Sequence, residues 1–207
     1  MHPNPAFRQT ETETALSVVR DRAFGMLTLS TDGAPLISHV PFLLSEGGTE
    51  AHLHLVRSNP IARACRTPRP ATLAVSGADG YVSPDWYGVE DQVPTWNYVA
   101  VHLTGVLHPL PIQELEPVLA AQSAAYEGRL IGKAPWTMDK MSADTKAKFL
   151  RMILPFRLEI AGVESTFKLN QNKEADARLN AAQSVSRGFG SELDQLARLM
   201  QDPPAGD

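Results

Sequence analysis

The 207 residues contain 43% hydrophobic and 20% charged side chains, proportions typical of a soluble globular protein with one buried core. No apolar run approaches the roughly 20 residues of a membrane span, and we expect no signal peptide. The single cysteine, Cys65, excludes an intramolecular disulfide and favours a reducing compartment, so we expect a cytoplasmic protein. The net charge of -4 excludes a general attraction to nucleic acids or anionic membranes.

The first half of the chain has the pattern of a helix followed by an antiparallel meander. Thr10 and Glu13 have capping-box spacing, and apolar residues then recur on one side of a predicted helix. Short apolar segments follow, separated by turn residues such as Asp32 and Gly33. Asn59 and Pro60 predict the start of a short helix. We expect strands at residues 24–30, 36–44, 51–56 and 71–76, with turns at 31–33, 47–48 and 78–80.

The second half mixes strands with helices. From Val99 onward apolar residues alternate, which predicts a strand with one buried face. Pro117 either kinks the following helix or marks its first turn, and Ser142 caps the next one. We expect helices at residues 112–126 and 142–152, strands at 155–161 and 163–169 around a turn at Gly162, a helix capped by Asn172, and a final amphipathic helix opened by Ser191.

These elements predict a mainly β fold with peripheral helices (α+β). Six or seven antiparallel strands joined by short loops favour a β-barrel with helical decoration. The sequence contains no internal repeat and no low-complexity segment.

Aromatic residues concentrate in residues 81–98, although they make up 7% of the chain. Tyr81, Trp86, Tyr87, Trp96 and Tyr98 surround two prolines, which make a stiff loop with flat apolar walls. Such walls suit either a plug in the core or a planar ligand, and the residues alone leave both interpretations open.

The histidines and the cysteine offer weaker signals. His52 and His54 share one face of a predicted strand, and His39 and His102 belong to other strands. No cysteine pair or acidic set completes a metal site, so we expect half-exposed strand histidines and no metal. Cys65 lies beside two arginines that could favour its thiolate, but a buried structural thiol is the preferred interpretation.

Two polar segments could hold an anion or a polar ring. Arg57, Ser58 and Asn59 offer a guanidinium, a hydroxyl and an amide where a strand gives way to a helix. The alternative is an ordinary helix cap beside a solvated arginine. Residues 167–173 (FKLNQNK) offer amides that can donate and accept hydrogen bonds together, or they form a turn and a helix cap.

Five motifs in this order resemble the FMN-binding negative transcriptional regulator family, which includes the protease synthase and sporulation negative regulators of bacteria. The motifs are SHVPFLL (38–44), HLVRSNP (54–60), YVSPDWY (81–87), VPTWNYVAVHLTG (93–105) and FKLNQNK (167–173). The resemblance implies a split β-barrel over residues 1–183 that binds FMN between the subunits of a homodimer. Residues 184–207 form a tail that the family pattern does not cover, and Asn170 stands where the family usually has serine.

The resemblance and the polar segments together suggest the cofactor contacts. Arg57 would hold the phosphate of FMN, aromatic side chains would wall its ring, and Lys168 would lie at the ring's polar edge. The candidate cofactor-binding residues are Ser38, His39, Arg57, Ser58, Asn59, Trp86, Trp96, Asn97, Tyr98, Lys168, Gln171 and Asn172.

Three functions remain open at this point. The first is a negative transcriptional regulator that senses or uses flavin and acts through a partner protein. The second is a flavin-dependent oxidoreductase like pyridoxamine phosphate oxidase or flavin reductase, and the third is a haem-binding or haem-degrading barrel. No helix-turn-helix pattern is visible, so we expect little or no direct binding to DNA.

Overall fold

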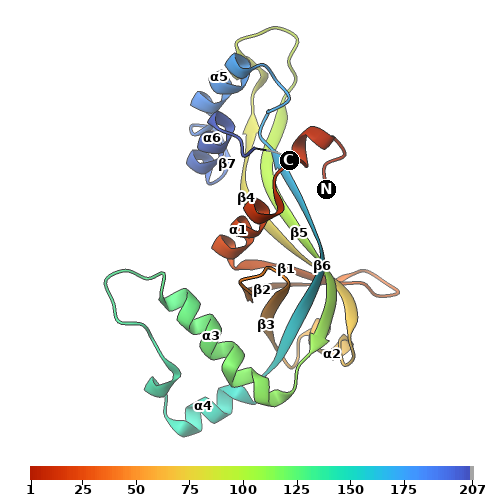
Figure 1. The fold of residues 1–207 in the computed structure, drawn as a ribbon, viewed down its shortest axis with the longest axis vertical. Helices are drawn as coiled ribbons and strands as arrows, with labels where there is room; N and C mark the ends of the chain where they lie inside the picture. Colours follow the sequence, from red (N-terminus) through yellow and green to blue (C-terminus); the bar gives the residue numbers. More distant parts are fainter. Residues whose placement is uncertain (206–207) are drawn as a thin grey trace. The chain divides into compact units, whose positions relative to one another are not determined.

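A computed structural model gives the structure of residues 1–205 as a seven-stranded antiparallel sheet with helices around it (Figure 1). The strand order is β1-β2-β3-β6-β5-β4-β7, and β1 also pairs with β4, so six strands close into a barrel. The expected β-barrel with helical decoration is therefore confirmed. The strands are β1 (Phe24–Leu29), β2 (Leu36–Leu44), β3 (Glu50–Val56), β4 (Arg69–Val82), β5 (Thr95–Pro109), β6 (Ile153–Lys168) and β7 (Gly190–Ser191).

The chain divides into two compact units. The central unit comprises residues 19–74 and 103–162, and the terminal unit comprises residues 1–18, 75–102 and the chain from Val163 onward. Strands β4, β5 and β6 and helix α1 (Thr12–Arg22) contribute residues to both. The other helices of the central unit are α2 (Pro60–Ala64), η3 (Ile112–Glu114), α3 (Leu115–Glu127), η4 (Met138–Lys140) and α4 (Ala143–Leu150). Those of the terminal unit are η1 (Pro5–Phe7), η2 (Pro84–Tyr87), α5 (Ala175–Val185) and α6 (Leu193–Gln201).

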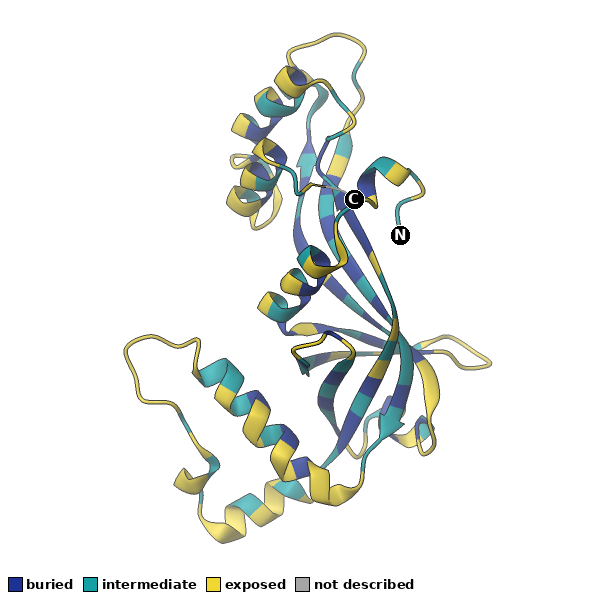
Figure 2. Ribbon diagram, viewed as in Figure 1, coloured by how far each residue is buried: buried dark blue, intermediate teal, exposed yellow. Residues whose placement is uncertain are grey.

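The core of the central unit follows from the alternation of apolar residues along its strands, visible as bands in Figure 2. Phe42 pairs with Leu53 and Leu44 with Ala51 across β2 and β3, and all four side chains are buried. Burying one large apolar side chain of this kind contributes about 1.5–3 kcal/mol. The hydrophobic pattern therefore fixes the strand register, because a slip by one residue would turn these side chains outward.

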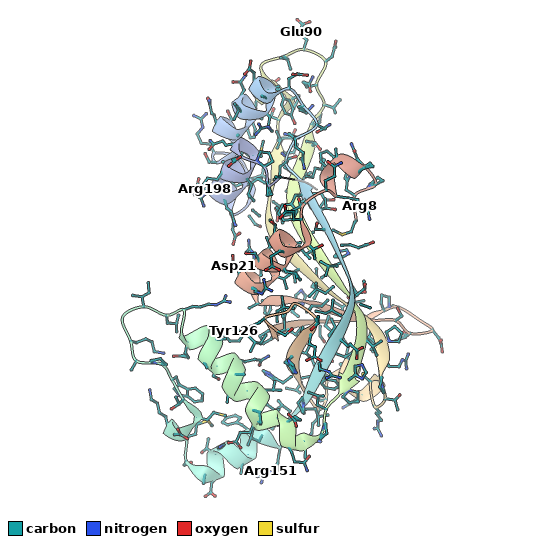
Figure 3. All side chains as sticks on the ribbon, in the orientation of Figure 1. Arg8, Asp21, Glu90, Tyr126, Arg151 and Arg198 are labelled. Carbon is teal, nitrogen blue, oxygen red and sulfur yellow. The ribbon has the colours of Figure 1, made fainter. Side chains whose placement is uncertain are left out.

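Helix α3 covers β2 and β3 and is fastened to them by polar side chains. The Tyr126 hydroxyl donates to the carbonyl of Phe42 at 2.7 Å, reaching from the helix toward β2 (Figure 3). Gln122 donates to the carbonyl of His52 and accepts from His54 Nδ1, both at 2.9 Å. Burial raises the pKa of Tyr126 to about 12, so this hydroxyl stays a donor at neutral pH.

The tail of the chain completes the terminal unit. Helices α5 and α6 pack together, and the Arg178 guanidinium on α5 donates to the carbonyls of Met200 and Gln201 at the end of α6. Leu196, Ala197 and Met200 are buried, so the expected amphipathic face is confirmed. That face packs within the terminal unit itself.

Several expected boundaries are wrong. Helix α6 begins at Leu193 with Glu192 as its N-cap, so Ser191, which lies in β7, does not open this helix. Strand β4 continues through residues 78–80, where we expected a turn, and β6 continues through Gly162. Glycine serves close packing at both places, since a Cβ on Gly80 would lie 2.8 Å from Leu193 and one on Gly162 would lie 2.8 Å from Thr104. Helix α5 has Glu174 as its N-cap, so Asn172 does not cap it.

Two other expectations on helix ends are confirmed. Asn59 and Ser142 cap α2 and α4 with their side chains, and Pro117 lies in the first turn of α3.

Within the described chain, no helix is both long enough and apolar enough to traverse a membrane.

Candidate functional site

A hollow of about 360 Å³ in the central unit is surrounded by positive charge. Arg57 follows β3, Arg63 belongs to α2, and Arg66 follows α2, and all three line this arginine pocket. The remaining lining residues are Ala62, Cys65, Pro109, Leu110, Leu154, Pro155 and Phe156. Because no carboxylate belongs to this described lining, three guanidinium groups share one hollow with no acidic side chain to neutralise them. Such a donor set suits a phosphate group.

Local hydrogen bonds hold the rim of the arginine pocket. Arg57 Nε donates to the carbonyl of Arg151 at 2.7 Å, which leaves its terminal nitrogens for other acceptors. Asn59 accepts from the Ile61 N–H at 2.8 Å as the cap of α2, and its amide donates to Ser38 Oγ at 2.7 Å. The structure therefore brings Ser38 to the segment of residues 57–59, as the candidate site requires.

His39 stands apart from this group. Its ring lies on the exposed face of β2 and stacks against Phe24, with 6.3 Å between the ring centres. The neighbouring Ser38 has the opposite parity along the strand, so the two side chains point to different faces of the sheet. His39 therefore does not belong to the rim of the arginine pocket.

An aromatic cluster forms in the terminal unit around Trp96, whose side chain is 45% exposed. Tyr81 and Phe189 stack on each other with ring centres 5.3 Å apart, and both meet Trp96 edge to face. Tyr87 is fully buried instead. The interpretation as a core plug is therefore confirmed for Tyr87, whereas a planar ligand against the exposed ring of Trp96 stays a prediction.

Lys168 lies beside this aromatic cluster. Its ammonium group donates to the carbonyl of Trp96 at 2.6 Å and to Thr95 Oγ1. Burial, and then the positive charge of Lys173, lowers the pKa of Lys168. The sequence placed Trp96 and Lys168 in one site, and they are indeed neighbours.

The rest of the 167–173 segment is engaged in its own turn. Gln171 accepts from the Leu169 N–H at 2.8 Å and donates to the carbonyl of Phe167. Asn170 has a left-handed backbone (φ 64°), which asparagine tolerates, and donates to the Tyr87 hydroxyl at 3.1 Å. Asn172 is exposed. The turn interpretation of this segment is thus the one that the hydrogen bonds favour.

Trp86, Asn97 and Tyr98 have different surroundings. Trp86 packs against Gly188, where a Cβ would lie 2.9 Å from its ring. Tyr98 is half-buried on the same side of β5 as Trp96. Asn97 is fully buried on the opposite side, and neither its Oδ1 nor its Nδ2 has a partner among the described protein atoms.

Replacing Asn97 by leucine is expected to raise the free energy of unfolding by about 1–3 kcal/mol, because an unpaired buried amide costs about that much. Urea denaturation measures the change. Asn170→Leu is the matched control, since its amide is bonded to Tyr87 and its loss should destabilise the protein. A weaker affinity for the cofactor in Asn97→Leu would instead show that Asn97 contacts it.

Metal ligands and a reactive thiol find no support. Among residues 1–205, no group of three or more His, Cys, Asp or Glu side chains could hold a metal ion. Cys65 is buried, and burial raises the pKa of its thiol although Arg69 opposes the shift. Its Sγ approaches the carbonyls of Thr67 and Leu107. The preferred interpretation of Cys65 as a structural thiol is confirmed.

Comparison with known proteins decides the family. Residues 1–162 match the protein family described as "Putative FMN-binding domain". The chain belongs to this family. FMN is accordingly its cofactor, and the resemblance that the five motifs indicated is confirmed. The arginine pocket of the central unit fits the phosphate of such a cofactor, and the partly exposed ring of Trp96 is a separate aromatic surface of the terminal unit.

Relatives of this FMN-binding family member agree with the fold. The Bacillus subtilis (strain 168) "Protease synthase and sporulation protein PAI 2" is 27% identical over 198 residues, which are 95% of this chain and 94% of that protein. Such coverage extends into the tail of residues 184–207, which the sequence motifs had left unmatched. The fold is similar to the flavocytochrome Anf3 from Azotobacter vinelandii (TM-score 0.60, 14% identity, 92% of this chain and 80% of that one). It is also similar to the FAD and heme binding protein from Mycobacterium smegmatis (TM-score 0.58, 19% identity, 89% and 82%).

Three residues near the candidate sites escaped the sequence reasoning. Arg63 and Arg66 were considered as neighbours of Cys65, yet they complete the arginine pocket with Arg57. Phe189 joins the aromatic cluster from the tail. A phenylalanine between two glycines, Gly188 and Gly190, was the available signal, because such a segment lets a backbone approach a neighbouring strand closely.

Proposed function

We propose that this protein is a flavin-sensing negative regulator of transcription that acts through a partner protein. The observation that carries the cofactor side of the proposal is the arginine pocket, with three guanidinium groups and no carboxylate in its described lining. The regulatory side is supported by the Bacillus relative, whose name connects it with protease synthesis and sporulation and whose match spans 95% of this chain.

In this proposal the phosphate of FMN binds to Arg57 with help from Arg63 and Arg66. Trp96 and Lys168, which belong to the terminal unit, are a separate candidate for the contacts of the flavin ring, supported by the exposure of Trp96 and the contact between these two residues. FMN, when bound, supplies an electron acceptor whose redox state a regulator can report. The residues of the protein bind and orient it.

We also propose a homodimer. Phe24 on β1 and Ile37 on β2 are 52% and 58% exposed, and Met26 and His39 pair on the same outer face of the sheet. Large apolar side chains gathered on a regular strand surface favour a protein interface. This supports the dimer that the family resemblance implies.

A flavin-dependent oxidoreductase is the second candidate, and Lys168 favours it. A positive charge beside the flavin ring stabilises the negative charge of the reduced cofactor and so assists electron uptake. The position of Lys168 against the Trp96 carbonyl would serve this role as well as it serves binding.

Steady-state oxidation of NADH by the FMN-saturated protein distinguishes the two functions. For the regulator we expect no turnover above that of free FMN, together with capture of a defined partner protein that depends on the redox state of the flavin. Sustained NADH oxidation that is lost in Lys168→Met would establish the oxidoreductase instead. A Soret band after addition of haem would point to the haem-binding alternative.

A further inference from the structure

A second hollow, of about 810 Å³, lies in the central unit on the outer side of α3. The side of the helix that carries Leu115, Val118 and Gln122 is buried, whereas the opposite side lines this hollow. The loop after α3 returns beside the helix before it reaches η4 and α4 (Figure 1). The lining residues are Gln113 from η3, Glu116, Pro117, Ala120, Ser123 and Ala124 from α3, Pro135 to Asp139 from the loop and η4, and Lys146 from α4.

The returning loop is fastened at both ends, which keeps the hollow open. Near the end of α3, Glu127 accepts from the Trp136 N–H at 2.7 Å and from the Lys133 ammonium. At the other end Glu116 pairs with Lys146 of α4. These contacts span the loop with hydrogen-bonded anchors, so the space between loop and helix is a built feature of the fold.

The lining has a shape and a charge that select a class of ligand. Small residues of α3, namely Pro117, Ala120 and Ala124, line one side of the hollow, and the half-buried Trp136 lines it from the returning loop. Volumes of roughly 300–1,000 Å³ with mostly apolar walls are typical of sites for small molecules. A flat, largely apolar molecule fits between such surfaces.

The charged residues of the lining favour one sign of charge on the ligand. Glu116 and Asp139 carry two negative charges against the single positive charge of Lys146, and the ammonium of Lys146 is already paired with Glu116. Asp139 has no ion pair within residues 1–205. Together with an aromatic residue, Trp136, in the lining, this excess of negative charge favours a cation.

We propose that the hollow between α3 and the 135–139 segment is an effector site for a flat aromatic molecule that carries a positive charge. This site shares no residue with the arginine pocket and differs from it in sign. It stands on its own geometry and does not depend on how FMN is used.

Calorimetric titration of the FMN-saturated protein tests the proposal with three probes that share one ring and differ in charge. Naphthylmethylammonium should bind roughly 5- to 30-fold more tightly than naphthylacetate, which is the factor that one cation–π contact contributes to affinity. The affinity of naphthylmethanol should lie between those of the two charged probes. Asp139→Asn should lower the affinity for the ammonium probe and leave that for the alcohol unchanged.

Two neighbouring alanines provide a matched pair of variants. Ala120 and Ala121 are both exposed on α3, but only Ala120 lines the hollow. Ala120→Phe should fill the space and reduce the affinity for all probes at least tenfold, whereas Ala121→Phe should leave it unchanged. If Ala120→Phe does not fold, as judged by circular dichroism, Ala124→Leu makes the same test.

Several outcomes would overturn the proposal. One is binding of the three probes with equal affinity, and another is binding that neither Ala120→Phe nor Ala124→Leu reduces. A third is a dimer that Ala120→Phe disrupts while no probe binds to the wild-type protein, because a second copy of the chain would then occupy the hollow.

Discussion

Replacing Gly105 by alanine is expected to prevent the protein from folding. A Cβ on Gly105 would lie 1.8 Å from the carbonyl oxygen of Glu159 and 3.1 Å from the Cα of Ile160, and both atoms belong to the backbone of β6. No side-chain movement can relieve this overlap, so β5 and β6 would have to separate in the middle of their pairing. The expected cost exceeds about 4 kcal/mol, which is comparable to the whole stability of many domains.

Soluble yield and urea denaturation measure this effect. Gly33→Ala is the control, because a Cβ there meets no atom closer than 3.9 Å and the stability should change by less than about 1 kcal/mol. If Gly105→Ala unfolds at the same urea concentration as the wild-type protein, the prediction is wrong. The space between Gly105 and the carbonyl oxygen of Glu159 would then be wider than the 1.8 Å that the added Cβ has here.

Replacing Arg57 by alanine is expected to weaken FMN binding about 10- to 150-fold. A bidentate contact between a guanidinium and a phosphate is worth roughly 1.5–3 kcal/mol, and this energy sets the range. Arg57→Lys should recover part of the affinity, because an ammonium cannot reproduce the planar fork or keep the bond from Nε to the Arg151 carbonyl. Fluorescence titration with FMN provides the measurement.

Riboflavin, which lacks the phosphate, is the control for Arg57. Its affinity should hardly change in Arg57→Ala, and equal losses for both ligands would mean that Arg57 acts through the fold.

Mixed dimers test whether the cofactor binds at a subunit interface. If two subunits share each site, mixing Arg57→Ala with Trp96→Ala chains regenerates one intact site per mixed dimer, and no regeneration would contradict a shared site.

Strands and helices that depend on local pattern were predictable, and two of the errors concern glycine. The range of β2 was predicted as residues 36–44 and observed as such, because alternating burial and short turns leave one solution. Gly80 and Gly162 looked like turn residues, yet each lies inside a long strand where another side chain needs the space. A sequence cannot distinguish a glycine that makes a turn from a glycine that leaves space for a neighbouring side chain. The second use depends on a residue more than 50 positions away in the chain.

The candidate site was predictable where contacts are local. Asn59, Arg57 and Ser58 adjoin in the chain, and the match between Trp96 and Lys168 came from family motifs. Arg63 and Arg66 were visible, but their convergence with Arg57 depends on where Pro109 and Pro155 place the end of the barrel. Asn97 stays a predicted contact of the cofactor, although alternation along β5 turns it inward while Trp96 faces outward. The alternation that begins at Val99 assigns Asn97 to the same face as Val99, which is the buried one.

Because Cys65 is buried, the rate at which its thiol is labelled reports local opening of the protein. This cysteine is the single thiol of the chain and lies in the central unit, so alkylating reagents can reach it only when that unit opens. Trp86 and Trp96 belong to the terminal unit, and their fluorescence follows that unit once Trp136, the third tryptophan and a residue of the central unit, is replaced by phenylalanine. Thiol labelling and tryptophan emission, recorded on one sample of the Trp136→Phe protein, would therefore reveal whether the two units unfold together or in sequence.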